Sequence, residues 1–160
     1  MIVEKLEKCR LKYLVHRFLV VENTHHWKII LADQSESKPI WHMDFSENLQ
    51  FTPKYEVQDV HFSKRQFSQH CTVQYTGDEA KYPYHLSDEL SHNINFVAAV
   101  VHDIVSKHSE KTDLFRFMSD NCGTQNKCHW TFGFWRELAR TTNKTFVIWG
   151  RSHITYSIYT

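Results

Sequence analysis

Apolar positions along the chain repeat with two different spacings, and the changes between these spacings predict the order of helices and strands. In the first part of the chain the pattern follows the period of a helix. It predicts an N-terminal helical region over residues 1–35, with an interruption expected at Asn23 and Thr24. The residues at this spacing are Leu11, Leu14, Val15, Phe18, Glu22, His25, Ile29 and Ile30.

The next part of the chain changes to the spacing of strands. Runs at 39–44, 56–62 and 68–75 predict three strands that form an antiparallel meander. The third run alternates most cleanly between apolar and polar positions. The stretch 76–84, which contains a glycine and a proline, predicts a loop after the meander.

The clearest helical pattern covers residues 87–108. Ser87 is the expected N-cap, and Asp88 and Glu89 lie in the first turn, where the helix dipole favours negative charge. Its apolar stripe predicts one buried face, formed by Ile94, Val97, Ala98, Val101, Ile104 and Val105.

The last predicted elements are two strands, at 114–118 and 145–149, on either side of a helix at 125–140. Large apolar side chains occur around most of this helix, so burial on two sides is expected. Gly133 is expected to allow the helix to approach the sheet closely.

This order of elements is that of an α/β fold of the ribonuclease H-like kind, with three antiparallel strands followed by alternating helix and parallel strand. We expect an N-terminal helical region at 1–35, a ribonuclease H-like domain at 39–150 and a tail at 151–160. In such a fold the first and fourth strands lie side by side. That arrangement would bring Asp44 and Asp120 together.

Asp44 and Asp120 are the candidate metal ligands, because each follows directly on an apolar run. Carboxylates at the ends of two neighbouring strands can hold a divalent cation between them. The alternative is that each aspartate forms a turn or caps a loop at the end of a strand, as aspartate commonly does.

Composition limits the class of protein. A chain of 160 residues that is 41% hydrophobic can form one domain with a buried core and no cross-links. The net charge of +1 lacks the basic excess typical of nucleic-acid-binding proteins. Basic residues between positions 5 and 17 are interleaved with glutamate, which favours a solvated helix face. No apolar run approaches the length of about 18 residues that indicates a membrane span.

The four cysteines and twelve histidines suggest zinc, but their spacing is unfavourable. Cys128 and His129 are adjacent, as are His25 and His26, and neighbouring residues are poorly placed to hold one ion. The first residues do not form a signal peptide. We therefore expect free thiols in a reducing, intracellular compartment.

Five short motifs follow one another along the chain. They are residues 44–48 (Asp-Phe-Ser-Glu-Asn), 57–62 (Val-Gln-Asp-Val-His-Phe), 68–71 (Ser-Gln-His-Cys), 119–122 (Ser-Asp-Asn-Cys) and 125–127 (Gln-Asn-Lys). In this order they resemble the motifs of transposase-derived domains in animal genomes, and the resemblance extends over about residues 40–149.

The resemblance implies a catalytic core of the three-carboxylate kind that transposases and integrases use on DNA. In that chemistry two divalent ions, Mg²⁺ or Mn²⁺, activate a water or a DNA 3′-hydroxyl. By position, Asp44 would bridge the two ions and Asp120 would hold one of them. Gln125 and Lys127 would contact phosphate, or else face water at the start of a helix. DNA as a partner implies a nuclear protein.

The chain departs from this pattern at its third acid, which such domains carry on a helix after the last strand. Residues 154–160 contain no carboxylate, and Glu137 is the last acidic residue. Glu47 or Asp59 would have to reach the same face from a different element. Two functions follow: a transposase fragment whose remaining acid lies elsewhere, or a domesticated, non-catalytic domain that binds protein, nucleic acid or a second copy of itself. The missing acid and the near-neutral charge favour the second.

Overall fold

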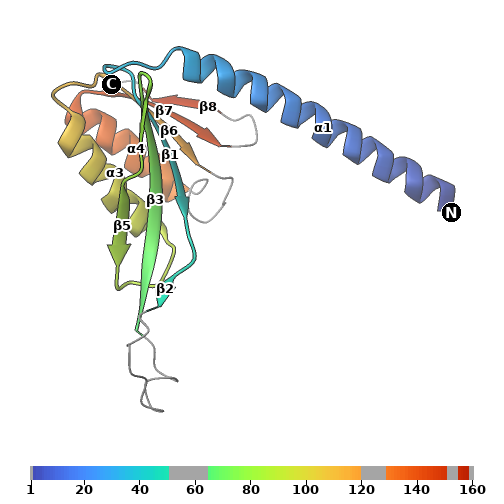
Figure 1. The fold of residues 1–160 in the computed structure, drawn as a ribbon, viewed down its shortest axis with the longest axis horizontal. Helices are drawn as coiled ribbons and strands as arrows, with labels where there is room; N and C mark the ends of the chain where they lie inside the picture. The colour runs from blue at the N-terminus through green and yellow to red at the C-terminus, as the bar shows by residue number, and fades with distance from the viewer. Residues whose placement is uncertain (1, 51–64, 120–128, 151–154, 159–160) are drawn as a thin grey trace.

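The computed structural model describes residues 2–50, 65–119, 129–150 and 155–158, and for residues 2–4 and 155–157 only the backbone (Figure 1). The predicted strand at 56–62 lies outside these ranges. The described elements, in chain order, are α1 (Ile2–Ala32), β1 (Ile40–Phe45), β2 (Leu49–Gln50), β3 (Gln66–Thr76), β4 (Glu79–Lys81), β5 (Tyr84–Ser87), α3 (Ile94–His108), β6 (Leu114–Ser119), α4 (His129–Thr142), β7 (Thr145–Gly150) and β8 (Thr155–Ile158).

The strands form one mixed, open sheet in which β1 is central. β1 is antiparallel to β3 on one side and parallel to β6 on the other, and β6 is parallel to β7. The path through the sheet is β2-β3-β1-β6-β7-β8, with β4 and β5 also paired to β3. The predicted α/β class, with a helix followed by a mixed sheet, is therefore confirmed.

The predicted order of the meander is wrong, because β3 pairs directly with β1. The stretch 76–84, predicted to be a loop, contains β4 and the start of β5, both paired to β3. Gly77 has a φ of 61°, which suits the first central position of a two-residue hairpin turn and lets the chain fold straight back onto β3.

Helix α3 starts seven residues later than predicted. Its N-cap is Asn93, whose side-chain oxygen accepts hydrogen bonds from the backbone amides of Asn95 and Phe96. Ser87 instead accepts a bond from the amide of Glu89, in the segment that precedes the helix. The predicted buried face is confirmed at Val97, Val101, Ile104 and Val105, and Val100 joins it.

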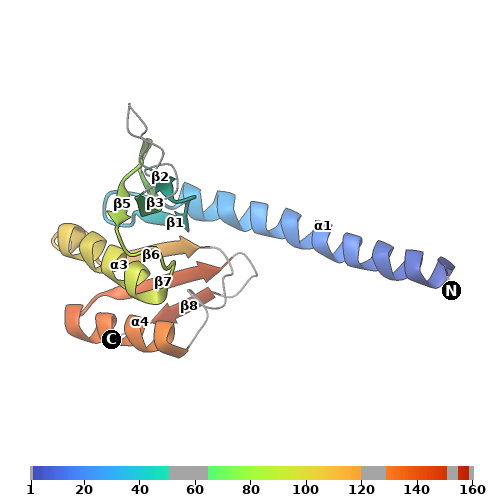
Figure 2. The same ribbon diagram turned by 90° about the horizontal axis from the view of Figure 1, so that it is seen from below.

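Helix α4 is buried on one side, so the prediction of burial on two sides is wrong. Its buried residues are Thr131, Trp135, Leu138 and Ala139. Trp130 is 70% exposed, and a Cβ added at the exposed Gly133 would meet nothing within 4 Å, so this glycine does not serve a close approach. The physical reason is that α3 and α4 cover the same face of the sheet, as Figure 2 shows, which leaves the outer side of α4 to solvent.

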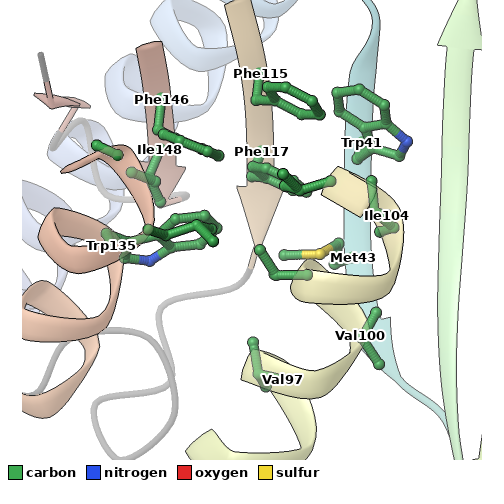
Figure 3. Close-up of a cluster of buried hydrophobic side chains, with 14 residues drawn as sticks. Trp41, Met43, Val97, Val100, Ile104, Phe115, Phe117, Trp135, Phe146 and Ile148 are labelled. Carbon is green, nitrogen blue, oxygen red and sulfur yellow. The ribbon is translucent and has the colours of Figure 1, made fainter. Parts of the chain in front are cut away.

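The core lies between that face of the sheet and the two helices (Figure 3). Trp41 is fully buried and stacks on Phe115 and Phe117 with ring centroids 5.3 Å away. Trp135 closes the core from α4, at 5.1 Å from Phe117. Aromatic side chains on three neighbouring strands therefore form the centre of the core.

Of the helices that the structure describes, the end of α1 is the part that packs on the opposite face of the sheet. Trp27 packs edge-on against His42 and Tyr75, with ring centroids at 6.0 and 5.7 Å. Arg116, buried in β6, donates to the carboxylate of Asp33 at 3.1 Å and to the carbonyl of Lys38. The rest of α1 projects beyond the domain (Figures 1 and 2).

Helix α1 is continuous, so the interruption expected at Asn23 and Thr24 is wrong. The Thr24 hydroxyl donates to the carbonyl of Val20, one turn earlier. The residue can therefore remain within the helix. The segment expected to be a tail also joins the fold: β8 pairs antiparallel with β7, and Ile158 packs against the core.

Among the residues that the structure describes, no helix combines the length and apolar character that crossing a bilayer requires.

Candidate functional site

The candidate site is at the carboxyl end of β1, where Asp44 is the fifth of six strand residues. Trp41 and Met43 belong to the core beneath α3 and α4. Because successive residues of a strand face opposite sides, His42 and Asp44 point to the other face of the sheet. Asp44 is exposed there, and its partner on β3 is Cys71.

The neighbouring strand on the parallel side is β6. Its pairing with β1 joins Ile40 to Arg116, Trp41 to Phe117 and His42 to Met118. The two residue numbers in each pair differ by 76 (116 − 40), and β6 ends at Ser119. The predicted juxtaposition of the two strands is therefore confirmed.

Three of the four predicted site residues lie outside the described residues. These are Asp120, which follows directly on the end of β6, and Gln125 and Lys127. Of the two acids proposed as replacements for the third carboxylate, Glu47 is exposed just after β1, and Asp59 lies outside the described residues.

Phe45 and Asn48, two of the motif residues that follow Asp44, point into the domain rather than toward the exposed side chain of Asp44. Phe45 stacks on His92 with ring centroids at 4.3 Å and meets His70 edge-on at 4.8 Å. The side-chain oxygen of Asn48 lies 2.9 Å from Nε2 of His92 and accepts from Ser68 at 3.4 Å. We call these five residues the anchor cluster. It fixes the chain immediately after Asp44 against β3 and the start of α3.

His70 is almost fully buried in the anchor cluster, with 2% of its surface exposed. Burial lowers the pKa of His70 to about 4, and the nearby His85 and His92 add to the shift. The side chain is therefore neutral at pH 7 and behaves as a polar core residue. The histidine of this motif therefore contributes to packing inside the domain.

A second polar group links β5 to α3. Nε2 of His85 lies 2.9 Å from Asp103, and Lys107 donates to the same carboxylate oxygen at 2.6 Å. The hydrogen bond from Lys107, followed by that from His85, lowers the pKa of the Asp103 carboxyl. Sequence reasoning missed this pair and the role of His92, because neither contact has a local spacing that could reveal it.

Asp44 is the predicted metal ligand that the described residues include. No group of three or more His, Cys, Asp or Glu residues within them is arranged to hold a metal ion. Asp44 has suitable chemistry, since carboxylate oxygen is what Mg²⁺ and Mn²⁺ prefer. Cys9 and Cys71, the two cysteines within them, are free thiols.

One comparison with known proteins gives a match. Residues 24–144 match the model of a family described as a domain of unknown function, DUF8701, and the chain belongs to this family. The match begins in the last third of α1 and ends just before β7, so it includes β1, β6 and the anchor cluster. No curated protein matches the chain.

Proposed function

We propose that this member of the DUF8701 family has a ribonuclease H-like core derived from a DNA transposase, and that the 160-residue chain alone does not cut or join DNA. One observation carries the proposal. Asp44 lies at the carboxyl end of a central strand that is antiparallel to β3 on one side and parallel to β6 on the other. This is the setting expected for the first acid of such a core.

The register between β1 and β6 supports a pair of acids. Asp44 and Asp120 differ by 76 in number, as do the three pairs joined in the described part of these strands. The last joined pair is His42 and Met118, and the same register continued for two further residues would make the two aspartates direct neighbours, at the separation of adjacent strands, about 4.8 Å. Two carboxylates so close favour binding of a cation, because their mutual repulsion is relieved.

The metal would be one Mg²⁺ or Mn²⁺ ion held by Asp44 and Asp120. When bound, it supplies positive charge that polarises a phosphate oxygen or a water. The anchor cluster would position Asp44 by holding the chain that follows it. Gln125 and Lys127 would contact the DNA phosphates.

Two carboxylates are too few for strand cleavage by two ions. Each ion must be held close to the other, and the required negative charge comes from several acids. The segment after β7 carries no acid, and β8 turns back along the sheet rather than forming a helix over the described residues 155–158. This is why we propose that the chain retains a weak metal site without the nuclease reaction.

The test combines DNA nicking and thermal melting in the presence of Mn²⁺. We expect supercoiled plasmid to remain intact with the parent chain. At ten times the dissociation constant, Mn²⁺ should raise the melting temperature by about 3 °C. Asp44→Ala and Asp120→Ala should each abolish that rise. Asp113→Ala is the control, because Asp113 is an exposed acid at the opposite end of β6.

Nicking by the parent that both substitutions remove would contradict the proposed inactivity and would indicate a third ligand, such as Glu47. A melting temperature that Mn²⁺ leaves unchanged, or a rise that survives in both variants, would contradict the metal site.

The alternative is a non-catalytic domain that keeps this fold in order to bind another macromolecule. The observation that favours it is the uncovered apolar surface of α1, with Leu11 65% and Phe18 62% exposed. The two functions are compatible, since α1 joins the domain at the amino end of β1, whereas Asp44 lies near its carboxyl end (Figure 1).

A further inference from the structure

Helix α1 exposes more apolar surface than a helix in contact with water alone would keep. It is 31 residues long, and its contacts with the described part of the domain lie at its C-terminal end, through Trp27 and through Asp33, which directly follows the helix. Large exposed apolar patches mark interaction sites. Helices in proteins gain most of their stability from packing, so the free part of α1 needs a surface to pack against.

Among its described side chains, helix α1 exposes ten large apolar residues, and one side of the helix carries five of them, while Leu6, Tyr13, Leu19 and Val20 lie on other sides. With 3.6 residues per turn, five of them fall within about a third of the circumference. We call these residues, Leu11, Leu14, Val15, Phe18 and Val21, the outer stripe; all five are at least half exposed. Trp27, which packs on the sheet, lies about half a turn away from the stripe. The outer stripe therefore faces away from its own domain.

We propose that the outer stripe packs against the outer stripe of a second copy of this chain, with the two helices antiparallel. Leu11, Leu14, Phe18 and Val21 follow one another at intervals of three, four and three residues. This alternation is the seam of a two-stranded coiled coil. A twofold axis near residue 16 pairs Leu11 with Val21, and Leu14 with Phe18, of the second copy.

Charges at both ends of the stripe favour the antiparallel arrangement. The same spacing continues to Glu7 on the N-terminal side and to His25 and Lys28 on the C-terminal side, all exposed. In the antiparallel pair Glu7 faces His25 of the second copy, and by register Glu4 is matched with Lys28. In a parallel pair each of these residues would face itself, which places glutamate against glutamate at one end of the stripe and lysine against lysine at the other.

Charged residues beside the seam also favour the antiparallel arrangement. Lys8 and Glu22 lie beside the stripe on the same side of the helix. In the antiparallel pair Lys8 of each copy lies opposite Glu22 of the other copy, so the dimer gains two favourable charge pairs. The contact is isologous, as in most twofold dimers. A helix of this length spans about 46 Å, so the two domains lie at opposite ends of the helix pair without contact.

Sedimentation of the 160-residue chain over a roughly hundredfold range of concentration tests the dimer. We expect twice the mass of one chain at the upper end. Leu14→Asp with Phe18→Asp should raise the dissociation constant at least about a hundredfold, since two charges per chain enter the seam. Val20→Asp is the control: it introduces the same charge at an exposed apolar residue outside the outer stripe and should leave the constant unchanged.

Charge exchange tests the orientation and preserves the apolar seam. Replacing Glu4 and Glu7 by Lys should weaken the antiparallel dimer about tenfold. Adding His25→Glu and Lys28→Glu to the same chain should restore it. A parallel dimer would not be weakened by the first set, because lysine would face lysine where glutamate faced glutamate. The second set would not strengthen it, because glutamate would then face glutamate at positions 25 and 28.

A wild-type chain that stays monomeric throughout overturns the proposal, and so does a loss of dimer with Val20→Asp as large as with the stripe variants. Weakening by the first exchange that the second exchange does not reverse overturns the antiparallel pairing.

Discussion

His70 belongs to a sequence motif, but in the structure its side chain is buried and packs against aromatic rings. It is an ionisable side chain in the core, between Phe45 and Phe96, with ring centroids at 4.8 and 6.0 Å. The alternation of the strand 68–75 could place His70 on one face, but could not tell that α3 covers that face. Its protonation can be followed through the dependence of stability on pH.

Lowering the pH should destabilise the protein through His70. The folded pKa of about 4 lies below the ordinary value of 6.5, so the unfolded chain binds the proton first. The stability from neutral His70 is therefore complete above pH 6.5 and is lost as the pH falls toward 4. Between pH 7 and pH 4.5 this loss in the free energy of unfolding should be about 2 kcal/mol.

Urea unfolding at the two pH values measures this loss. His70→Phe, which keeps an aromatic ring in the anchor cluster, should reduce the difference between them by that amount. His102→Gln is the matched control, because His102 is an exposed histidine on α3. Equal pH dependence in the parent and in His70→Phe would contradict the assignment.

Among the elements, the strands formed by continuous apolar runs could be predicted from the sequence, but the start of helix α3 could not. The strands at 114–118 and 145–149 agree with β6 and β7 to within one residue, because continuous apolar runs are typical of strands buried in a parallel sheet. The start of α3 was misplaced because Ser87 and Asn93 are both good N-caps. Only the tertiary position of β5, which ends at Ser87, decides between them.

The two candidate caps can be compared directly. Asn93→Ala should lower the free energy of unfolding by about 1 kcal/mol, since it removes an acceptor shared by two helix amides. Ser87→Ala should cost less than about half of that, because its hydroxyl serves a segment outside the helix. Chemical denaturation of both variants checks the order. A larger loss with Ser87→Ala would mean that the helix begins earlier.

The buried face of α3 gives a stronger effect. Val101 is fully buried, so Val101→Asp places a charge in the core without a partner and should cost about 4 kcal/mol or more. Ala99→Asp puts the same residue on the exposed side of the same helix and should cost under about 1 kcal/mol. Thermal melting of the two variants tests this, and similar melting temperatures would be incompatible with the packing of α3 on the sheet.

At the scale of the whole molecule, the sequence could predict the neighbouring strands but not the faces that the helices cover. The order of elements placed β1 beside β6, and the structure agrees. It could not predict that α3 and α4 share one face, which leaves Asp44 exposed on the other. Nor could it predict how much of α1 stays outside the domain, since helical spacing fixes a helix without fixing what it packs on.

The proposed metal site requires Asp44 and Asp120 to be direct neighbours across β1 and β6, and a disulfide between cysteines at these two positions tests this directly. Neighbouring strands are about 4.8 Å apart, within the range of about 4.4–6.8 Å between the Cα atoms of a disulfide. The four native cysteines should first be replaced by Ser, above all Cys71, which also faces position 44. Asp44→Cys with Asp113→Cys, at the far end of β6, is the control.

Mass spectrometry of non-reduced peptides after mild oxidation gives the answer. We predict an intramolecular disulfide between positions 44 and 120 in high yield, and none between 44 and 113. An Asp44→Cys/Asp120→Cys chain that stays reduced, or that crosslinks no better than the control, would contradict the register that the proposed metal site requires.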